Sequence, residues 1–183
     1  KIESNSELYQ QSNTANLYLN IYEGKITKIK TIYFVGNKYF DNDVLRSEIR
    51  SKTKSLSNIF ANNNFKLFQV ESDAIRIENF YKNNGFIDVN VNFDIEYQDK
   101  NNKAFIYFRI SEGLKYNFRK IDHENLIEDL NNVSSSEIND LLDSNSNLIK
   151  KPFNQSILDD LKTSIADTLE KNGHNFFEIK TMK

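Results

Sequence analysis

Residues 86–97 read FIDVNVNFDIEY and form the clearest pattern in the chain. Apolar residues alternate with polar ones from Ile87 to Tyr97. A period of two predicts a β-strand with one buried face and one solvated face. The next apolar stretch, residues 104–110, is apolar on both faces until Arg109. Because strands covered on both faces lie inside a sheet, we expect 104–110 at the centre and 86–97 at the edge.

The residues before this stretch predict one strand and two helices. Residues 28–35 are β-branched and aromatic, and they end at the turn signal Gly36-Asn37. Asp41 is positioned to cap a short helix, and apolar residues at helical spacing predict a second helix over 67–83. The polar stretch 52–64 between them is predicted to be a loop.

Gly85 stands where the second helix needs a left-handed cap. Residues 25–113 are therefore predicted to form an α+β domain of order β-α-α-β-β, with a three-stranded mixed sheet covered on one face by two helices. The predicted core consists of apolar residues at consistent spacing: Ile32, Phe34, Val70, Ile77, Tyr81, Val89, Val91, Ile106 and Phe108.

An internal repeat with a period of nearly 90 residues organises the chain. Ile21-Tyr22-Glu23-Gly24 recurs as Ile110-Ser111-Glu112-Gly113, and Asn84-Gly85 recurs as Asn172-Gly173. A period of this length is typical of tandem small domains. We therefore predict three parts: the C-terminal strands of a preceding unit (1–24), a complete unit (25–114), and a unit truncated before its last strand (115–183).

Residues 115–183, the third part, repeat the order β-α-α-β-β less clearly than the complete unit. We predict a strand over 115–122, a helix that starts with a capping box at Ser134–Glu137, a long helix over 154–171, and the beginning of a strand at 176–182. No Pro-rich or Ser-rich linker separates the units near Gly113 to Tyr116. We expect a short joint there of only moderate stiffness.

Composition excludes several classes of function. Among 183 residues, 27% are charged, yet the net charge is only -2, which argues against an electrostatic nucleic-acid binder. The absence of Cys removes disulfides, thiolate catalysis and most zinc motifs. The chain has neither an initiating Met nor a signal-like segment, and we expect it to be a piece of a longer protein.

A search for catalytic chemistry yields no candidate site. His123 and His174 lie on different units, and the carboxylate pairs Asp41/Asp43 and Asp159/Asp160 are better explained as a cap and a solvated helix face. Lys25, Lys28 and Lys30 form a basic patch that fits a solvated surface better than a nucleic-acid site. We predict no catalytic residue, no metal and no cofactor. A small hydrolase with an unrecognised site remains an alternative.

The predicted edge strand is the candidate binding feature. An edge strand leaves backbone N–H and C=O groups unpaired, so another chain can add to it. The alternative is a purely structural strand whose edge is protected by Asp88, Asp94 and Glu96. The candidate residues for partner binding are Ile87, Asp88, Val89, Asn90, Val91, Asn92, Phe93, Asp94 and Ile95, and the structural turn residues are Gly36, Asn37, Gly85 and Gly113.

These features together resemble POTRA domains, the tandem repeats of outer-membrane β-barrel assembly proteins. The resemblance rests on Ile32-x-Phe34-x-Gly36-Asn37, on Tyr81-x3-Gly85-Phe86 and on the Ile-x-Glu-Gly strand end that occurs twice. It covers essentially the whole chain. The long loop at 52–64 makes the complete unit resemble the third POTRA domain of such a protein. Residues 1–24 would then be the end of the second domain, and 115–183 would be most of the fourth.

The resemblance implies a function and a location. It implies a non-enzymatic periplasmic module of an outer-membrane protein whose parent chain carries a barrel. The expected partners are unfolded outer-membrane β-barrel proteins and accessory lipoproteins of the assembly complex, bound by β-augmentation at the second strand of the unit, with no nucleic acid. The alternative is a POTRA array of a two-partner secretion or autotransporter-assembly transporter.

Overall fold

The alternating stretch forms the outer strand of a three-stranded sheet. The computed structural model describes residues 2–9, 11–54, 62–121 and 132–180. Strand β4 (Asn90–Gln98) pairs antiparallel with β5 (Lys103–Ser111), and β3 (Lys28–Val35) pairs parallel with β5. The order is β3-β5-β4, so the sheet is mixed and β5 is its central strand, as predicted. The short 3-10 helix η1 (Asp99–Asn101) joins β4 to β5.

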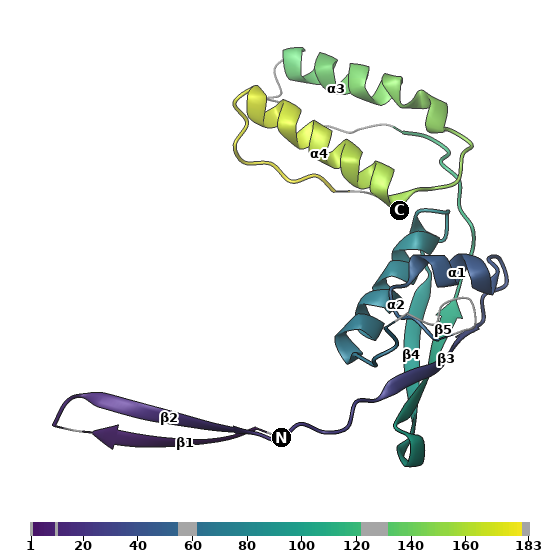
Figure 1. Cartoon of the computed structure of the whole chain (residues 1–183). Helices are drawn as coiled ribbons and strands as arrows, with labels where there is room; N and C mark the ends of the chain where they lie inside the picture. Colours follow the sequence, from purple (N-terminus) through teal and green to yellow (C-terminus); the bar gives the residue numbers. More distant parts are fainter. Residues whose placement is uncertain (1, 10, 55–61, 122–131, 181–183) are drawn as a thin grey trace.

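Two helices cover one face of this sheet (Figure 1). They are α1 (Asn42–Glu48) and α2 (Leu67–Lys82), and the order β-α-α-β-β is confirmed. Asp41 occupies the N-cap position of α1, but its side chain makes no capping hydrogen bond. Only its carbonyl is used, accepting from the Leu45 amide at 3.2 Å. The predicted side-chain cap is therefore wrong, although the helix starts where Asp41 indicated.

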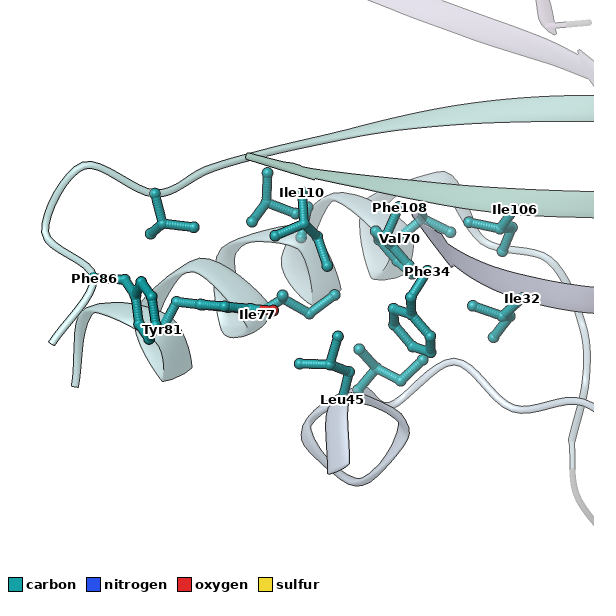
Figure 2. Packing of buried hydrophobic residues seen from close by; sticks show 14 of the residues in the cluster. Ile32, Phe34, Leu45, Val70, Ile77, Tyr81, Phe86, Ile106, Phe108 and Ile110 are labelled. Atoms are coloured by element: carbon teal, nitrogen blue, oxygen red, sulfur yellow. The ribbon is translucent and has the colours of Figure 1, made fainter. Parts of the chain in front are cut away.

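Side chains from both helices and all three strands meet between the helices and the sheet. Figure 2 shows Tyr81 and Ile77 of α2 pointing at the sheet, with Leu45 of α1 close to Phe34. All nine predicted core residues belong to this cluster, and Tyr81, Ile77, Ile106 and Phe108 are fully buried. Burial of large apolar side chains supplies most of the free energy that holds such a domain together.

Gly36 makes the exit from β3 possible. Its φ is +94°, and a Cβ at this position would lie 2.2 Å from the carbonyl oxygen of Ile110. A side chain would therefore collide with the central strand, so only glycine fits. The next residue completes the turn, because Nδ2 of the Asn37 side chain donates to the Phe40 carbonyl at 2.9 Å and to Asn42 Oδ1 at 2.8 Å.

The first residues form a separate hairpin. Strands β1 (Ile2–Tyr9) and β2 (Thr14–Ile21) pair antiparallel, and every residue of both strands is exposed. Figure 1 shows this hairpin extending away from the helices and the three-stranded sheet.

The third part contains two packed helices. They are α3 (Asn132–Ser144) and α4 (Gln155–Lys171), joined through the 3-10 helix η2 (Ser146–Leu148). Helix α4 ends at the predicted residue and begins one residue later than predicted, since Asn154 is its N-cap, and α3 begins two residues before the predicted capping box. Its core joins Ile138 and Leu142 of α3 to Leu169 of α4.

Of the strand predicted over 115–122, the described residues, which run to 121, contain only an isolated antiparallel bridge between Asn117 and Pro152. Around this bridge the Phe118 amide donates to the Lys151 carbonyl at 2.9 Å, and the Lys150 amide donates to the Phe118 carbonyl at 2.8 Å. Residues 176–180 likewise form no strand, and 181–182 lie outside the described residues. His123 also lies outside them.

The second and third parts meet in a hydrogen-bonded joint without a linker. The Tyr116 amide donates to the Gly85 carbonyl at 2.8 Å, and the Tyr116 hydroxyl donates to Asp88 Oδ2 at 3.1 Å. That hydrogen bond, together with the negative charge of Asp88, raises the pKa of Tyr116. The short connection is as predicted.

The side chain of Asn83, which follows α2, also caps α4. Its Oδ1 accepts from the Ser156 amide at 3.0 Å and from the Ser156 hydroxyl at 3.1 Å. Gly85 lets the segments approach, since its φ is +102° and a Cβ would lie 2.9 Å from the Tyr116 carbonyl oxygen. These contacts favour one orientation of the two units more strongly than the sequence suggested.

We therefore expect Asn83→Ala to loosen the joint. Spin labels on Glu71→Cys and Asp167→Cys, both exposed on helices of different units, report the distance between them. The unmodified joint should give a narrow distance distribution by double electron–electron resonance, and Asn83→Ala should broaden it. Asn84→Ala is the matched control, because the side-chain amide of Asn84 donates to the Phe80 carbonyl within its own unit. A broad distribution before any joint mutation would instead support free relative motion.

Candidate strand-docking edge

Strand β4 lies at an edge of the sheet. All nine of its residues pair with β5, and within the described residues no strand pairs with its other side. In an antiparallel edge strand, about every second residue directs its N–H and C=O away from the neighbour. The edge position that the alternation predicted for this strand is therefore confirmed.

The edge strand begins later than the predicted binding segment. Ile87, Asp88 and Val89 precede β4, in a turn where the Val89 amide donates to the Phe86 carbonyl at 3.4 Å. Phe86 and Val89 are both buried, and this packing bends the backbone before the strand begins. The predicted residues that lie on the edge itself are Asn90, Val91, Asn92, Phe93, Asp94 and Ile95, and the strand continues through Glu96, Tyr97 and Gln98.

The polar side chains of β4 are tied to the central strand. Asp94 forms an ion pair with Arg109, and Glu96 accepts a hydrogen bond of 3.1 Å from the Tyr107 hydroxyl. This hydrogen bond raises the pKa of Tyr107. The carboxylates thus engage β5 across the solvated face of the sheet. Asp88, the third residue considered as edge protection, accepts from Tyr116 in the joint.

The helix side of β4 forms an apolar shelf that becomes more exposed along the strand. Val91 is buried, Phe93 and Ile95 are half-buried, and Tyr97 is 54% exposed. The Phe65 ring contacts Tyr97 edge-to-face, with centroids 5.6 Å apart. We define the shelf as Phe65, Phe93, Ile95 and Tyr97. It lies at the end of β4 away from the joint.

The opposite edge of the sheet is partly closed. The Ile29 amide donates to the Asn63 carbonyl at 2.7 Å, and the Phe65 amide donates to the Thr27 carbonyl at 2.9 Å. The pairing of β3 is also irregular between Ile29 and Thr31. Residues 63–65 therefore occupy the backbone groups at the start of β3, and β4 offers the longer free edge.

Glu112 stabilises the end of the sheet near the joint. Its Oε1 accepts from the amides of Lys38 and Tyr39, both at 2.8 Å, and from the Tyr81 hydroxyl at 2.9 Å. Burial, with the hydrogen bond to Glu112 as a second cause, raises the pKa of Tyr81 far above its usual value. Gly113, the fourth predicted turn residue, follows directly with a φ of +71°.

The role of Glu112 was not predicted from the sequence, where Glu112 was interpreted only as part of a turn. The recurrence of Glu at the same place in both Ile-x-Glu-Gly motifs was the pattern that pointed to it. Asp73 was not predicted either: it is a fully buried carboxylate on α2 that accepts from the amides of Arg50 and Ser51, both at 2.8 Å. Among the described residues, no group of three or more His, Asp or Glu side chains could hold a metal ion.

Comparisons with known proteins agree with this architecture. The family model POTRA, described as a surface antigen variable number repeat, matches residues 27–113. The chain is 21% identical over 168 residues to the outer membrane protein assembly factor BamA of Neorickettsia risticii, covering 91% of this chain and 22% of that protein. It is 28% identical over 132 residues to BamA of Neisseria meningitidis, covering 71% and 16%. The chain thus spans about a fifth of the length of these relatives.

A solved structure has a similar fold. The crystal structure of Haemophilus influenzae BamA POTRA3-5 superposes with a TM-score of 0.64 at 24% identity, covering 81% of this chain and 56% of that one.

Glu112→Ala should lower the free energy of unfolding by about 1–3 kcal/mol, because the hydroxyl of the buried Tyr81 loses its acceptor together with the backbone amides of the exposed residues Lys38 and Tyr39. Urea denaturation measures this change as a lower midpoint at unchanged slope. Glu23→Ala is the matched control: Glu23 occupies the same motif position but is exposed, so its effect should stay within about 0.5 kcal/mol. Equal effects of the two substitutions would show that Glu112 does not act through these contacts.

The three-stranded mixed sheet, the two helices on one face and the sequence match together identify residues 27–113 as a POTRA domain of the kind found in BamA proteins.

Proposed function

We propose that this chain is a non-enzymatic periplasmic module of an outer-membrane protein assembly factor, and that β4 receives segments of unfolded outer-membrane β-barrel proteins as an added strand. The observation that carries the proposal is the free edge of β4 beside a half-buried apolar shelf whose Tyr97 is exposed. The sequence similarity to BamA proteins supports the setting. The same edge is available to the accessory lipoproteins of such a complex.

Backbone pairing would supply modest affinity that is tolerant of sequence. Four to six added hydrogen bonds, at roughly 0.5–1.5 kcal/mol each, give only a few kcal/mol before the cost of ordering the peptide is subtracted. Dissociation constants of about micromolar to millimolar follow from such energies. A module that handles many different precursors requires binding of this kind.

The shelf would add a preference for alternating sequences. A strand added to β4 continues the pleat, so its side chains point alternately to the helix side and to the solvated face. On the helix side they meet Phe93, Ile95 and Tyr97, and on the solvated face they meet Asn92, Asp94 and Glu96. A peptide with one apolar and one polar face satisfies both sides. Membrane-spanning β-strands have this pattern.

Disulfide trapping tests where the strand adds, since the chain has no native Cys. Asn92→Cys places a thiol on β4, and Val35→Cys places one at 44% exposure on β3 as the matched control. An alternating ten-residue barrel-derived peptide carries one central Cys as its disulfide with thionitrobenzoate, and the protein thiol displaces thionitrobenzoate to form the protein–peptide disulfide. This exchange should be faster at Asn92→Cys. Equal rates at the two edges would remove β4 as the specific acceptor.

Tyr97→Ser tests the contribution of the shelf. Losing part of the apolar contact should raise the Kd of the same peptide, without its Cys, about three- to tenfold in a fluorescence anisotropy titration. Tyr33→Ser is the control, because Tyr33 is 42% exposed on the opposite edge and lies on the solvated face. A peptide of the same composition in blocks, with apolar residues first and polar residues last, should bind more weakly. Equal binding of the two peptides would contradict the preference for alternation.

A further inference from the structure

The start of the β3 edge is closed by a single side chain as well as by backbone. Both backbone polar groups of Ile29 point away from β5 and meet Asn63. The Ile29 amide donates to the Asn63 carbonyl at 2.7 Å, and Nδ2 of the Asn63 side chain donates to the Ile29 carbonyl at 3.1 Å. Asn63 is only 8% exposed. One residue therefore makes both hydrogen bonds that a neighbouring strand would make with Ile29.

Arg46 of α1 covers the next outward position of β3. Its Nη2 donates to the Ile32 carbonyl at 3.4 Å, and its Cζ lies 5.7 Å from the centroid of the Phe34 ring. The attraction between the guanidinium and the ring holds this side chain along the strand. Residues of a strand point their backbone groups alternately to its two sides, so those of Phe34 also point outward. Of the three outward residues, Ile29 and Ile32 are thus covered.

The β3 edge has two further features that disfavour the addition of a strand. Its pairing with β5 is irregular between Ile29 and Thr31, which places an extra residue, Lys30, in the edge. Lys30 is exposed, and the Lys28 ammonium donates to Asn64 Oδ1. Bulges, lysines and covering segments are the features by which proteins protect a sheet edge from pairing with another chain.

Strand β4 shows neither the bulge nor the lysines. Its pairing with β5 is regular over all nine residues, and Asn90–Gln98 contains no Lys or Arg. Its two carboxylates are held by Arg109 and Tyr107 on the solvated face. The two edges therefore differ in the side chains that lie over their outward backbone groups.

We infer that Arg46 and Asn63 are specificity-determining residues that confine strand addition to the β4 edge. The inference rests on the proposed docking at β4 and identifies what excludes the second edge. A strand that approached β3 would have to displace Asn63 from Ile29 and Arg46 from the Ile32 carbonyl before it gained hydrogen bonds there. At β4 it gains them directly, so one domain accepts one strand.

Removing the two side chains should open the second edge. Arg46→Ala and Asn63→Ala, singly and together, are made in the Val35→Cys and Asn92→Cys chains, which have no other Cys. Each thiol reacts with the alternating peptide that carries thionitrobenzoate on its Cys. The rate is divided by that of a two-residue Cys peptide with the same leaving group, which is too short to pair as a strand.

Arg50→Ala is the matched control. It removes the same charge near the end of α1, and the hydrogen bond of Arg50 to Asp73 comes from its backbone amide, which the substitution retains. Circular dichroism and urea denaturation identify the variants that remain folded.

The double substitution should raise the normalised rate at Val35→Cys about fivefold or more, toward that at Asn92→Cys, while the rate at Asn92→Cys stays unchanged. If the double variant does not fold, Arg46→Ala alone decides, with an expected rise of about twofold. Arg50→Ala should change neither rate.

An unchanged rate at Val35→Cys in folded variants, with Asn92→Cys still faster, would overturn the inference and leave docking at β4 intact. Equal rises at both thiols would also overturn it, because the substitutions would then act by loosening the whole domain. Equal rates at the two thiols before either substitution would contradict the docking itself.

Discussion

Strand β5 is the element on which the rest of the domain depends, because both other strands pair with it alone. The parallel pairing of β3 with β5 requires a crossover, and α1 and α2 lie within that crossover. The helices therefore cover the face that holds Ala104, Ile106 and Phe108, each fully buried. Since β3 takes one side of β5, the antiparallel hairpin return can place β4 only on the other side, at the edge.

The two ends of this sheet have different properties. At the end where β5 leaves, Glu112, Gly85 and Asn83 make directional contacts that hold the unit together and attach it to α4. At the opposite end, Phe65 and Tyr97 form an exposed aromatic contact beside free backbone groups. Stability therefore depends on residues that a docking strand would not touch. A strand docked at the shelf end, as proposed, would leave the core and the joint undisturbed.

Much of this arrangement follows from sequence periodicity. The bounds of β3, the bounds of α4 to within one residue, and all nine core residues were predictable, because a helix or strand that buries one face must repeat its apolar residues at a fixed spacing. The edge position of β4 was predictable for the same reason, since a half-solvated strand alternates. The start of β4 was not, because Ile87 and Val89 continue the alternation through a turn.

Contacts between residues far apart in the chain were not predictable. The acceptor role of Glu112 depends on Tyr81 and on the amides after Gly36, and the cap that Asn83 gives to α4 joins residues 73 positions apart. The segment 115–121 has strand-like residues, but among the described residues it pairs only at one isolated bridge, between Asn117 and Pro152. Periodicity describes which face is buried, whereas these contacts depend on which segments meet.

Amide hydrogen exchange of β4, followed by nuclear magnetic resonance with and without an alternating barrel-derived peptide, tests the central claim most directly. In the free protein, alternate amides of Asn90–Gln98 should exchange fast because they point away from β5, while the others are protected by the ladder. Peptide binding should protect those fast amides and leave the amides of β3 unchanged. Protection that appears on β3 or on the helices while the β4 amides remain fast would contradict the account.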